Sequence, residues 1–209
     1  RLEELLTFLL NQRAFDKALH YLNEEWQSDG LLDKIRRLDW LSHIYHMQKD
    51  TDALMEVLGE AFELQSTPSR LKAIMAVASP AQQSKWRKRA YELAEQQENK
   101  TRAYLALAKT YFEMQDYTSS IYYIEALLDN KDALSKYELS ELYGDIALCH
   151  AALKHIGVGQ ASIRRSLELN ENDPDTLIVA GRFFLMEAKA CNDETAKAEN
   201  QAKGELYFR

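Results

Sequence analysis

The sequence predicts an all-α fold of about five to six antiparallel helix pairs. Glycine and proline, which turns and sheet edges use, occur only 7 and 3 times in 209 residues, whereas leucine and alanine together fill 55 positions. Leucine and alanine favour helices, while strands prefer β-branched and aromatic residues. Large and small apolar residues also recur at helical spacings in blocks of about 34 residues, and six such blocks account for nearly the whole chain. We therefore expect one domain over residues 1–209.

The first two blocks are each expected to form two helices around a polar turn. Apolar residues three and four positions apart lie on one face of a helix, and each block has two such stripes. In the block at about 1–33 the stripes are Leu2, Leu5, Leu6 and Leu9, then Phe15, Ala18 and Leu22. In the block at about 35–67 they are Leu38, Leu41, Ser42 and Tyr45, then Leu54, Leu58 and Ala61, with the polar run 48–52 between them.

The third and fourth blocks differ in how clearly they show the pattern. The block at about 68–100 is interrupted by Pro80 and fits more weakly, through Leu71, Ile74, Met75, Ala78, Tyr91 and Ala94. The block at about 101–133 is the clearest, with the stripes Tyr104, Leu107, Ala108 and Tyr111, then Ile121, Ile124, Leu127 and Leu128. The short polar turn 114–116 is expected to join its two helices.

The last two blocks complete the chain at about 138–173 and 174–203. Their stripes are Tyr143, Ile146, Ala147 and His150, then Ile156, Ile163 and Ser166, and finally Leu177, Ala180, Gly181 and Phe184. Residues 131–136 separate the fourth block from the fifth, as a longer loop or an extra helical turn. Residues 192–203 favour a helix but carry few apolar side chains, so they suit the closing helix of a stack or a frayed tail. Gly204 is then expected to let the chain turn.

The spacing within these blocks resembles that of the tetratricopeptide repeat. In the fourth block a large residue, Tyr104, is followed by Leu107, the small Ala108 and the aromatic Tyr111. The resemblance covers most of the chain, but the glycine that the family usually has between the two helices is replaced here by Arg13, Lys49, Gln115 or Lys154. The resemblance implies a right-handed α-solenoid of about five to six helix pairs, and a function in binding other proteins.

The resemblance also implies where a partner would bind. In that family the first helices of successive repeats line the concave groove of the superhelix. Carried over position by position, this places ten candidate partner-binding residues in the groove: Arg36, Trp40, His43, Met47, Lys72, Arg102, Lys109, Phe112, Asp145 and Arg182. Such a mixture of aromatic, cationic and methionine side chains suits a peptide or helix of a partner protein.

Individual roles can be assigned within this groove. We expect Trp40 and Phe112 to anchor the partner segment, although both fit the core between neighbouring helices equally well. Arg102, Lys109 and Arg182 would orient the carboxylates of the partner. The clamp with which some family members hold a C-terminal carboxylate needs a lysine and an asparagine in the first repeat, where this chain has Glu3 and Thr7.

No motif in the sequence indicates an enzyme. A glycine-rich phosphate loop, a Gly-x-Ser-x-Gly elbow and a His-Glu-x-x-His motif are all absent from the sequence. His43 and His46 could share a metal on one helix, but no third ligand follows at a helical spacing. We therefore expect no catalytic residues, no cofactor and no metal site.

Charge and hydropathy limit the classes of partner that the chain is expected to bind. With 26 basic and 33 acidic residues, the net charge of −7 gives no general attraction to nucleic acid. The basic run 84–89 is better explained as the solvated face of a helix whose apolar side includes Trp86. No apolar run is long enough to predict membrane insertion. Two cysteines, Cys149 and Cys191, are too few for a disulfide framework and favour a reducing, cytoplasmic location.

The function expected from the sequence is that of a protein-interaction scaffold or adaptor. Two alternatives remain open. The chain could be a regulatory or sensory module of a longer protein that couples ligand binding to a fused effector domain. It could also assemble with itself through a terminal repeat, because the stripe from Leu2 to Leu9 would need cover at an open end.

Overall fold

The computed structural model describes residues 2–26 and 30–208. Arg1, residues 27–29 and Arg209, which fall inside the expected domain 1–209, lie outside the described residues. Every regular element in the described part of the chain is a helix, so the expected all-α class is confirmed. The chain forms two compact units, which we call unit 1 (Arg1–Gln96) and unit 2 (Gln97–Arg209) and describe separately.

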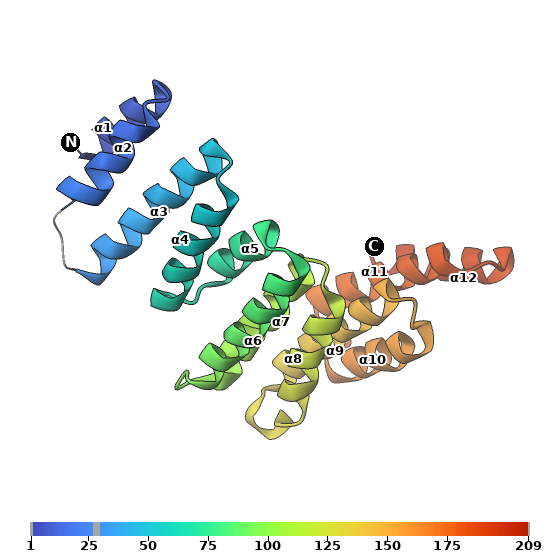
Figure 1. Cartoon of the computed structure of the whole chain (residues 1–209). Coiled ribbons are helices and arrows are strands. Elements are labelled where there is room, and N and C mark those ends of the chain that lie inside the picture. The colour runs from blue at the N-terminus through green and yellow to red at the C-terminus, as the bar shows by residue number, and fades with distance from the viewer. Residues whose placement is uncertain (1, 27–29, 209) are drawn as a thin grey trace. The chain divides into compact units, whose positions relative to one another are not determined.

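Unit 1 contains three helix pairs along the chain (Figure 1). Its helices are α1 (Leu2–Asn11), α2 (Phe15–His20) with the π-helical turn η1 (Tyr21–Glu25), α3 (Leu31–Gln48), α4 (Thr51–Leu64), α5 (Pro68–Val77) and α6 (Pro80–Glu95). Pro80, which interrupts the third sequence block, occupies the first turn of α6, where a missing backbone N–H costs nothing. The core of the first two pairs includes Leu6, Leu22 and Ile44, none of which is exposed.

Unit 2 also contains three helix pairs. Its helices are α7 (Lys100–Glu113), α8 (Tyr117–Leu128), α9 (Lys136–Ala152), α10 (Ile156–Leu169), α11 (Pro174–Ala190) and α12 (Glu194–Leu206), with the 3₁₀ turn η2 (Lys131–Ala133) before α9. The additional residues between the fourth and fifth sequence blocks therefore form an extra helical turn. Helix α9 packs against α8, α10 and α11, and α11 packs against α12. Phe183 and Phe184 lie in the core that these contacts enclose.

A short polar residue caps the start of six α-helices in the described part of the chain. In each case a side-chain oxygen accepts a hydrogen bond from a backbone N–H in the first turn, which would otherwise have no partner. The pairs are Asp50 with Ala53, Asn99 with Arg102, Asp116 with Ser119, Ser135 with Glu138, Asp173 with Thr176 and Asp193 with Ala196. The helix starts are thus encoded locally, independently of the core.

Four hairpin turns share one unusual backbone conformation. Arg13, Lys49, Gln115 and Lys154 have φ angles of 53°, 60°, 61° and 63°, which lie in the left-handed region. These are the four positions where the repeat family usually has glycine. Equivalent backbone hydrogen bonds close all four turns. In the turn at Lys49, for example, Lys49 N–H donates to His46 O and Asp50 N–H donates to Tyr45 O. Each of the four non-glycine residues therefore strains its turn.

Replacing Lys49 with glycine is expected to stabilise unit 1 by about 0.5–1 kcal/mol, because relief of the left-handed strain exceeds the extra backbone entropy of glycine. A matched control is Lys88→Gly in the exposed middle of α6, where glycine should destabilise by about 1 kcal/mol. Urea unfolding of both variants measures the difference. Destabilisation by Lys49→Gly equal to that of the control would contradict the strain argument.

Small residues allow helices to approach one another closely. Ala108 and Ala147 are buried between helices, and Ser120 Oγ donates to Ala108 O at 2.9 Å. The expectation for Gly204 is wrong: this glycine does not turn the chain but lies buried inside α12. A Cβ at Gly204 would come within 3.0 Å of the carbonyl oxygen of Gly181, so the contact between α11 and α12 requires a residue without a side chain.

Candidate functional site

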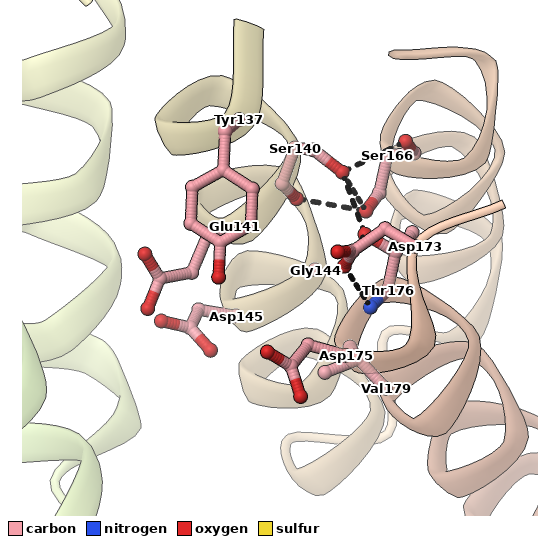
Figure 2. Close-up of a pocket in the computed structure, with 10 residues that line it drawn as sticks. All are labelled: Tyr137, Ser140, Glu141, Gly144, Asp145, Ser166, Asp173, Asp175, Thr176 and Val179. Carbon is pink, nitrogen blue, oxygen red and sulfur yellow. Dashed lines mark hydrogen bonds between the residues drawn. The ribbon is translucent and has the colours of Figure 1, made fainter. Parts of the chain in front are cut away.

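A cavity of about 150 Å³ opens between α9 and α11 in unit 2. Figure 2 shows its walls: α9 contributes one row of side chains, α11 and the residue before it contribute the opposite row, and Ser166 comes from α10. We call this the α9–α11 pocket. Its lining residues are Tyr137, Ser140, Glu141, Gly144, Asp145, Ser166, Asp173, Asp175, Thr176 and Val179.

The floor of the α9–α11 pocket is a network of buried hydroxyl groups, drawn with dashed lines in Figure 2. Ser140 Oγ donates to the carbonyl oxygen of Ser166 at 3.0 Å and lies 3.1 Å from Thr176 Oγ1. Ser166 Oγ donates to the carbonyl oxygen of Ser140 at 2.7 Å. Thr176 Oγ1 donates to Asp173 Oδ2 at 3.0 Å. Because these bonds join α9, α10 and the start of α11, they hold the pocket walls in a fixed relation.

The width of the pocket is set by a close contact at Gly144. A Cβ on Gly144 would lie 2.9 Å from Val179 Cγ1, closer than side-chain atoms pack. Any larger residue on α9 at this position would push α11 away. The walls therefore come together at Gly144 and Val179.

An ion pair with α7 stands beside this pocket. Lys109 Nζ on α7 lies 2.8 Å from Glu141 Oε1 on α9, and both side chains are partly exposed. The hydrogen bond to Glu141 raises the pKa of Lys109, so this lysine stays charged. Lys109 is therefore already paired with a carboxylate of its own chain.

Asp145 is a half-buried carboxylate of the pocket. Burial is the main cause that raises its pKa from the ordinary 3.8 to about 6, and the negative charge of Glu141 adds to this effect. The positive charges of Lys109 and Arg182 act in the opposite direction without cancelling it. Asp145 is thus a carboxylate that would gain from a further cation nearby.

The mouth of the pocket is also electronegative. The carboxylate of Asp175 is the main cause that raises the pKa of Tyr137, and Glu141 is the second. The Tyr137 ring is exposed at the same opening. An aromatic face beside several carboxylates is an arrangement that binds cations, through the ring quadrupole and through charge.

Five of the ten candidate groove residues lie in unit 2. The structure brings three of them together electrostatically, since Lys109 and Arg182 both act on Asp145. Arg102 lies exposed in the first turn of α7. Phe112 packs against the core of unit 2 and meets Tyr117 edge to face, with ring centroids 5.8 Å apart.

The other five candidates lie in unit 1. Lys72 is on α5. The other four follow one side of α3 at intervals of three and four residues: Arg36, Trp40, His43 and Met47. Trp40 is partly buried against the core of unit 1, whereas Arg36, His43 and Met47 are exposed. The bond between Arg70 and Asp39, with both guanidinium nitrogens on the carboxylate, ties α5 to α3 beside this stripe.

Of the ten residues that line the pocket, only Asp145 was a sequence candidate. Three of the others, Tyr137, Glu141 and Asp175, contribute to the electrostatics described above. Glu141 and Tyr137 precede Asp145 by one and two helical turns, so their common face could have been found by extending the stripe of Asp145. Asp175 has no such signal, because its position depends on how α11 packs on α9. Extending the pattern along one helix could therefore have found Glu141 and Tyr137 but not Asp175.

Two other groupings were noted in the sequence, a histidine pair and a basic run. No group of three or more His, Cys, Asp or Glu residues that could hold a metal is found within residues 2–26 and 30–208. In the basic run, Arg89 pairs with Glu63 and Glu92, and Trp86 meets Phe62 edge to face with centroids 5.9 Å apart. None of the helices in the described part of the chain combines the length and hydrophobicity that crossing a membrane requires.

One family model matches part of the chain. Residues 101–133, which cover α8 and all but the first residue of α7, match the family model of the tetratricopeptide repeat. Among solved structures, the "MamA RS-1 ArsTM double mutant" is 12% identical over 100% of this chain and 93% of that chain, with a TM-score of 0.40. PilW, described as a widely conserved type IV pilus biogenesis factor, is 14% identical over 98% of this chain and 91% of that chain, with a TM-score of 0.45. No curated protein matches the chain.

Proposed function

We propose that this chain, a protein with a tetratricopeptide repeat at residues 101–133, is an interaction scaffold whose unit 2 holds a segment of a partner protein. The repeat supports a function in protein interaction in general terms. The chemistry of the α9–α11 pocket supports the finer proposal, that the segment presents a lysine or arginine side chain to Asp145.

The observation that carries this proposal is the imbalance of charge at the pocket. Glu141, Asp145, Asp173 and Asp175 line it, and the cations that act on Asp145 leave its pKa well above the ordinary value. A lysine or arginine of the partner would supply the missing positive charge, and its carbon stem would pack against Tyr137. The sequence suggested that Lys109 orients carboxylates of the partner. Because Lys109 is already paired with Glu141, a partner that presents a positive charge is favoured instead.

The pocket geometry also suits a protein partner. Its floor is held by buried hydroxyl bonds, and a rigid wall lowers the entropy cost of binding. The segment would lie across α9 and α11, with one basic residue inserted as its anchor. In this arrangement, Lys109 and Arg182 would donate hydrogen bonds to backbone carbonyls of the segment.

A fluorescence anisotropy titration tests the proposal, with labelled pentapeptides that differ only in a central Lys, Gln or Glu. The Lys peptide is expected to bind more tightly than the Gln peptide, and Asp145→Asn should weaken it about tenfold, the usual effect of losing a charge-assisted hydrogen bond. Asp132→Asn, an exposed aspartate in η2, is the matched control. Equal affinities for the three peptides, or equal effects of the two variants, would exclude the pocket as the binding site.

Self-assembly through the first repeat is less well supported. The stripe that suggested it is largely covered by unit 1 itself: Leu6 and Leu9 are buried in the core, and Leu2 and Leu5 pack against it. The coupling of ligand binding to a fused effector domain stays a prediction.

A further inference from the structure

A second cavity of unit 2, of about 230 Å³, has the opposite chemical character. It lies among α10, α11 and α12, the last three helices in Figure 1. Its apolar lining includes Ile163, Phe184 and Tyr207, and its polar lining includes Arg164, Asn200 and Lys203. We call it the α10–α12 pocket. No residue is shared between it and the α9–α11 pocket.

The apolar lining of the α10–α12 pocket is an ordered aromatic surface. The rings of Phe184 and Tyr207 are stacked, with an interplanar angle of 7° and centroids 5.8 Å apart. Phe184 and Ile163 are nearly inaccessible to solvent, which fixes their positions. Lys203 Nζ lies 4.0 Å from the centroid of the Phe184 ring, a cation–π distance. The ring therefore positions the ammonium group within the pocket.

The two cations of this pocket lack anionic partners. Neither Arg164 nor Lys203 forms an ion pair with a carboxylate of the described residues. Cations one position away on α10 and two turns away on α12 do form such pairs: Arg165 with Glu168 at 3.0 Å and Lys197 with Glu194 at 3.3 Å. Two cations that line one cavity without a carboxylate partner are an arrangement suited to an added carboxylate.

A carboxylate also lies near this pocket. The carboxylate of Glu187 is buried on α11, and its Oε1 accepts a hydrogen bond from Gln160 Nε2 at the pocket wall. The Gln160 amide is thus already engaged. Recognition of a carboxylate falls to Arg164, Lys203 and the Asn200 amide.

We propose that the α10–α12 pocket binds an aspartate or glutamate side chain from an acidic segment of a partner protein. Its carboxylate would lie between Arg164 and Lys203, and its apolar neighbour would pack on the rings of Phe184 and Tyr207. A polyanion such as nucleic acid fits less well, because the chain carries a net charge of −7 and a long anion would meet repulsion beyond the pocket. The pocket adds a second, oppositely charged contact point to the one proposed between α9 and α11.

Chemical-shift mapping with short blocked dipeptides tests this inference. The probes are N-acetyl-Phe-Glu-amide, the neutral N-acetyl-Phe-Gln-amide and the basic N-acetyl-Phe-Lys-amide, each titrated into the ¹⁵N-labelled chain. The Glu probe is expected to shift amides around Arg164 and Lys203 and to bind there more tightly than the Gln probe. The double variant Arg164→Gln/Lys203→Gln should weaken it about five- to tenfold.

The control is the double variant Arg165→Gln/Lys197→Gln, which removes the same charges from paired positions on the same helices. Unchanged binding in this control is expected, and equal weakening in both double variants would overturn the inference, because it would show only the effect of net charge. Binding of the Lys probe at this pocket, attracted by Glu187, would also overturn it. Tighter binding of inorganic phosphate than of the Glu probe would assign the pocket to a different anion.

The same experiment separates this inference from the proposed function. The Lys probe is expected to shift amides around Tyr137 and Asp145 instead. Loss of that response with the Glu response intact would count against the α9–α11 pocket alone. The reverse result would count against the α10–α12 pocket alone.

Discussion

Replacing Gly159 with leucine is expected to destabilise unit 2 by about 2–3 kcal/mol. Gly159 is buried in α10, and a Cβ built on it would lie 2.5 Å from Phe183 Cε2 and 3.2 Å from the carbonyl oxygen of Ala147. Phe183 is completely buried, so its ring cannot move aside without disturbing the core. The leucine must therefore separate α10 from both α9 and α11.

The same helix offers an opposite control two residues earlier. Gly157 is exposed, and nothing lies within 4 Å of a Cβ at that position. Gly157→Leu should stabilise α10 by about 0.5–1 kcal/mol through helix propensity alone. Hydrogen–deuterium exchange of α10 and α11 amides, together with urea unfolding, measures both variants. If the two leucines change stability in the same direction, the close contact of Gly159 with Phe183 does not limit the packing of α10.

The helices and their turns could be predicted from the sequence because they depend on neighbours along the chain. The stripe Tyr104, Leu107, Ala108 and Tyr111 lies within α7, and the expected turn at 114–116 joins α7 to α8. The left-handed turn at Gln115 was also located, through the glycine that the repeat family has there. These features need only local spacing and backbone geometry.

The candidate site was less predictable because its charges interact across helices. The pairing of Lys109 with Glu141 depends on the rotation of α9 relative to α7, which no spacing within one helix specifies. Trp40 and Phe112 illustrate the same difficulty. Both could serve as partner contacts or as core, and both pack against the core of their own unit. The division of the ten candidate residues between two units was not anticipated either.

The wrong prediction for Gly204 has a similar cause. A glycine after a polar helical stretch usually indicates a helix end. Here the requirement comes from the neighbouring helix, because Gly181 on α11 leaves room only for another glycine on α12. The contact between two glycines on different helices gives no signal in either helix taken alone.

Asp145→Asn is expected to stabilise unit 2 by about 1–3 kcal/mol at pH 7.5 and to have little effect at pH 4. The folded protein raises the pKa of Asp145 from 3.8 to about 6, chiefly by burial. Between about pH 4 and pH 6 the folded state therefore retains a proton that the unfolded chain has lost. Stability contributed by this group falls as the pH rises through that window and stays low above it. The asparagine variant lacks the titration and loses this pH dependence.

Urea unfolding of the wild type and the variant at half-unit steps from pH 4 to pH 8 measures this effect. The difference between the two proteins isolates Asp145 from other carboxylates, such as Glu63 and Glu138, whose pKa values are lowered. Asp175→Asn at the same pocket, where the side chain is exposed, serves as the control and should not reproduce the curve. A difference in unfolding free energy that stays constant across the range would show that folding does not raise the pKa of Asp145.

The cost of holding Asp145 ionised also links stability to binding. A cation that enters the α9–α11 pocket would lower the pKa of Asp145 and recover the stability lost above pH 6. The Lys pentapeptide should therefore bind more tightly at pH 7.5 than at pH 5. At pH 5, binding of its lysine should release a proton from Asp145. Isothermal titration calorimetry in two buffers of different ionisation enthalpy detects that proton. Equal heats in the two buffers at pH 5 would show that binding releases no proton. Asp145 would then affect stability without taking part in ligand recognition.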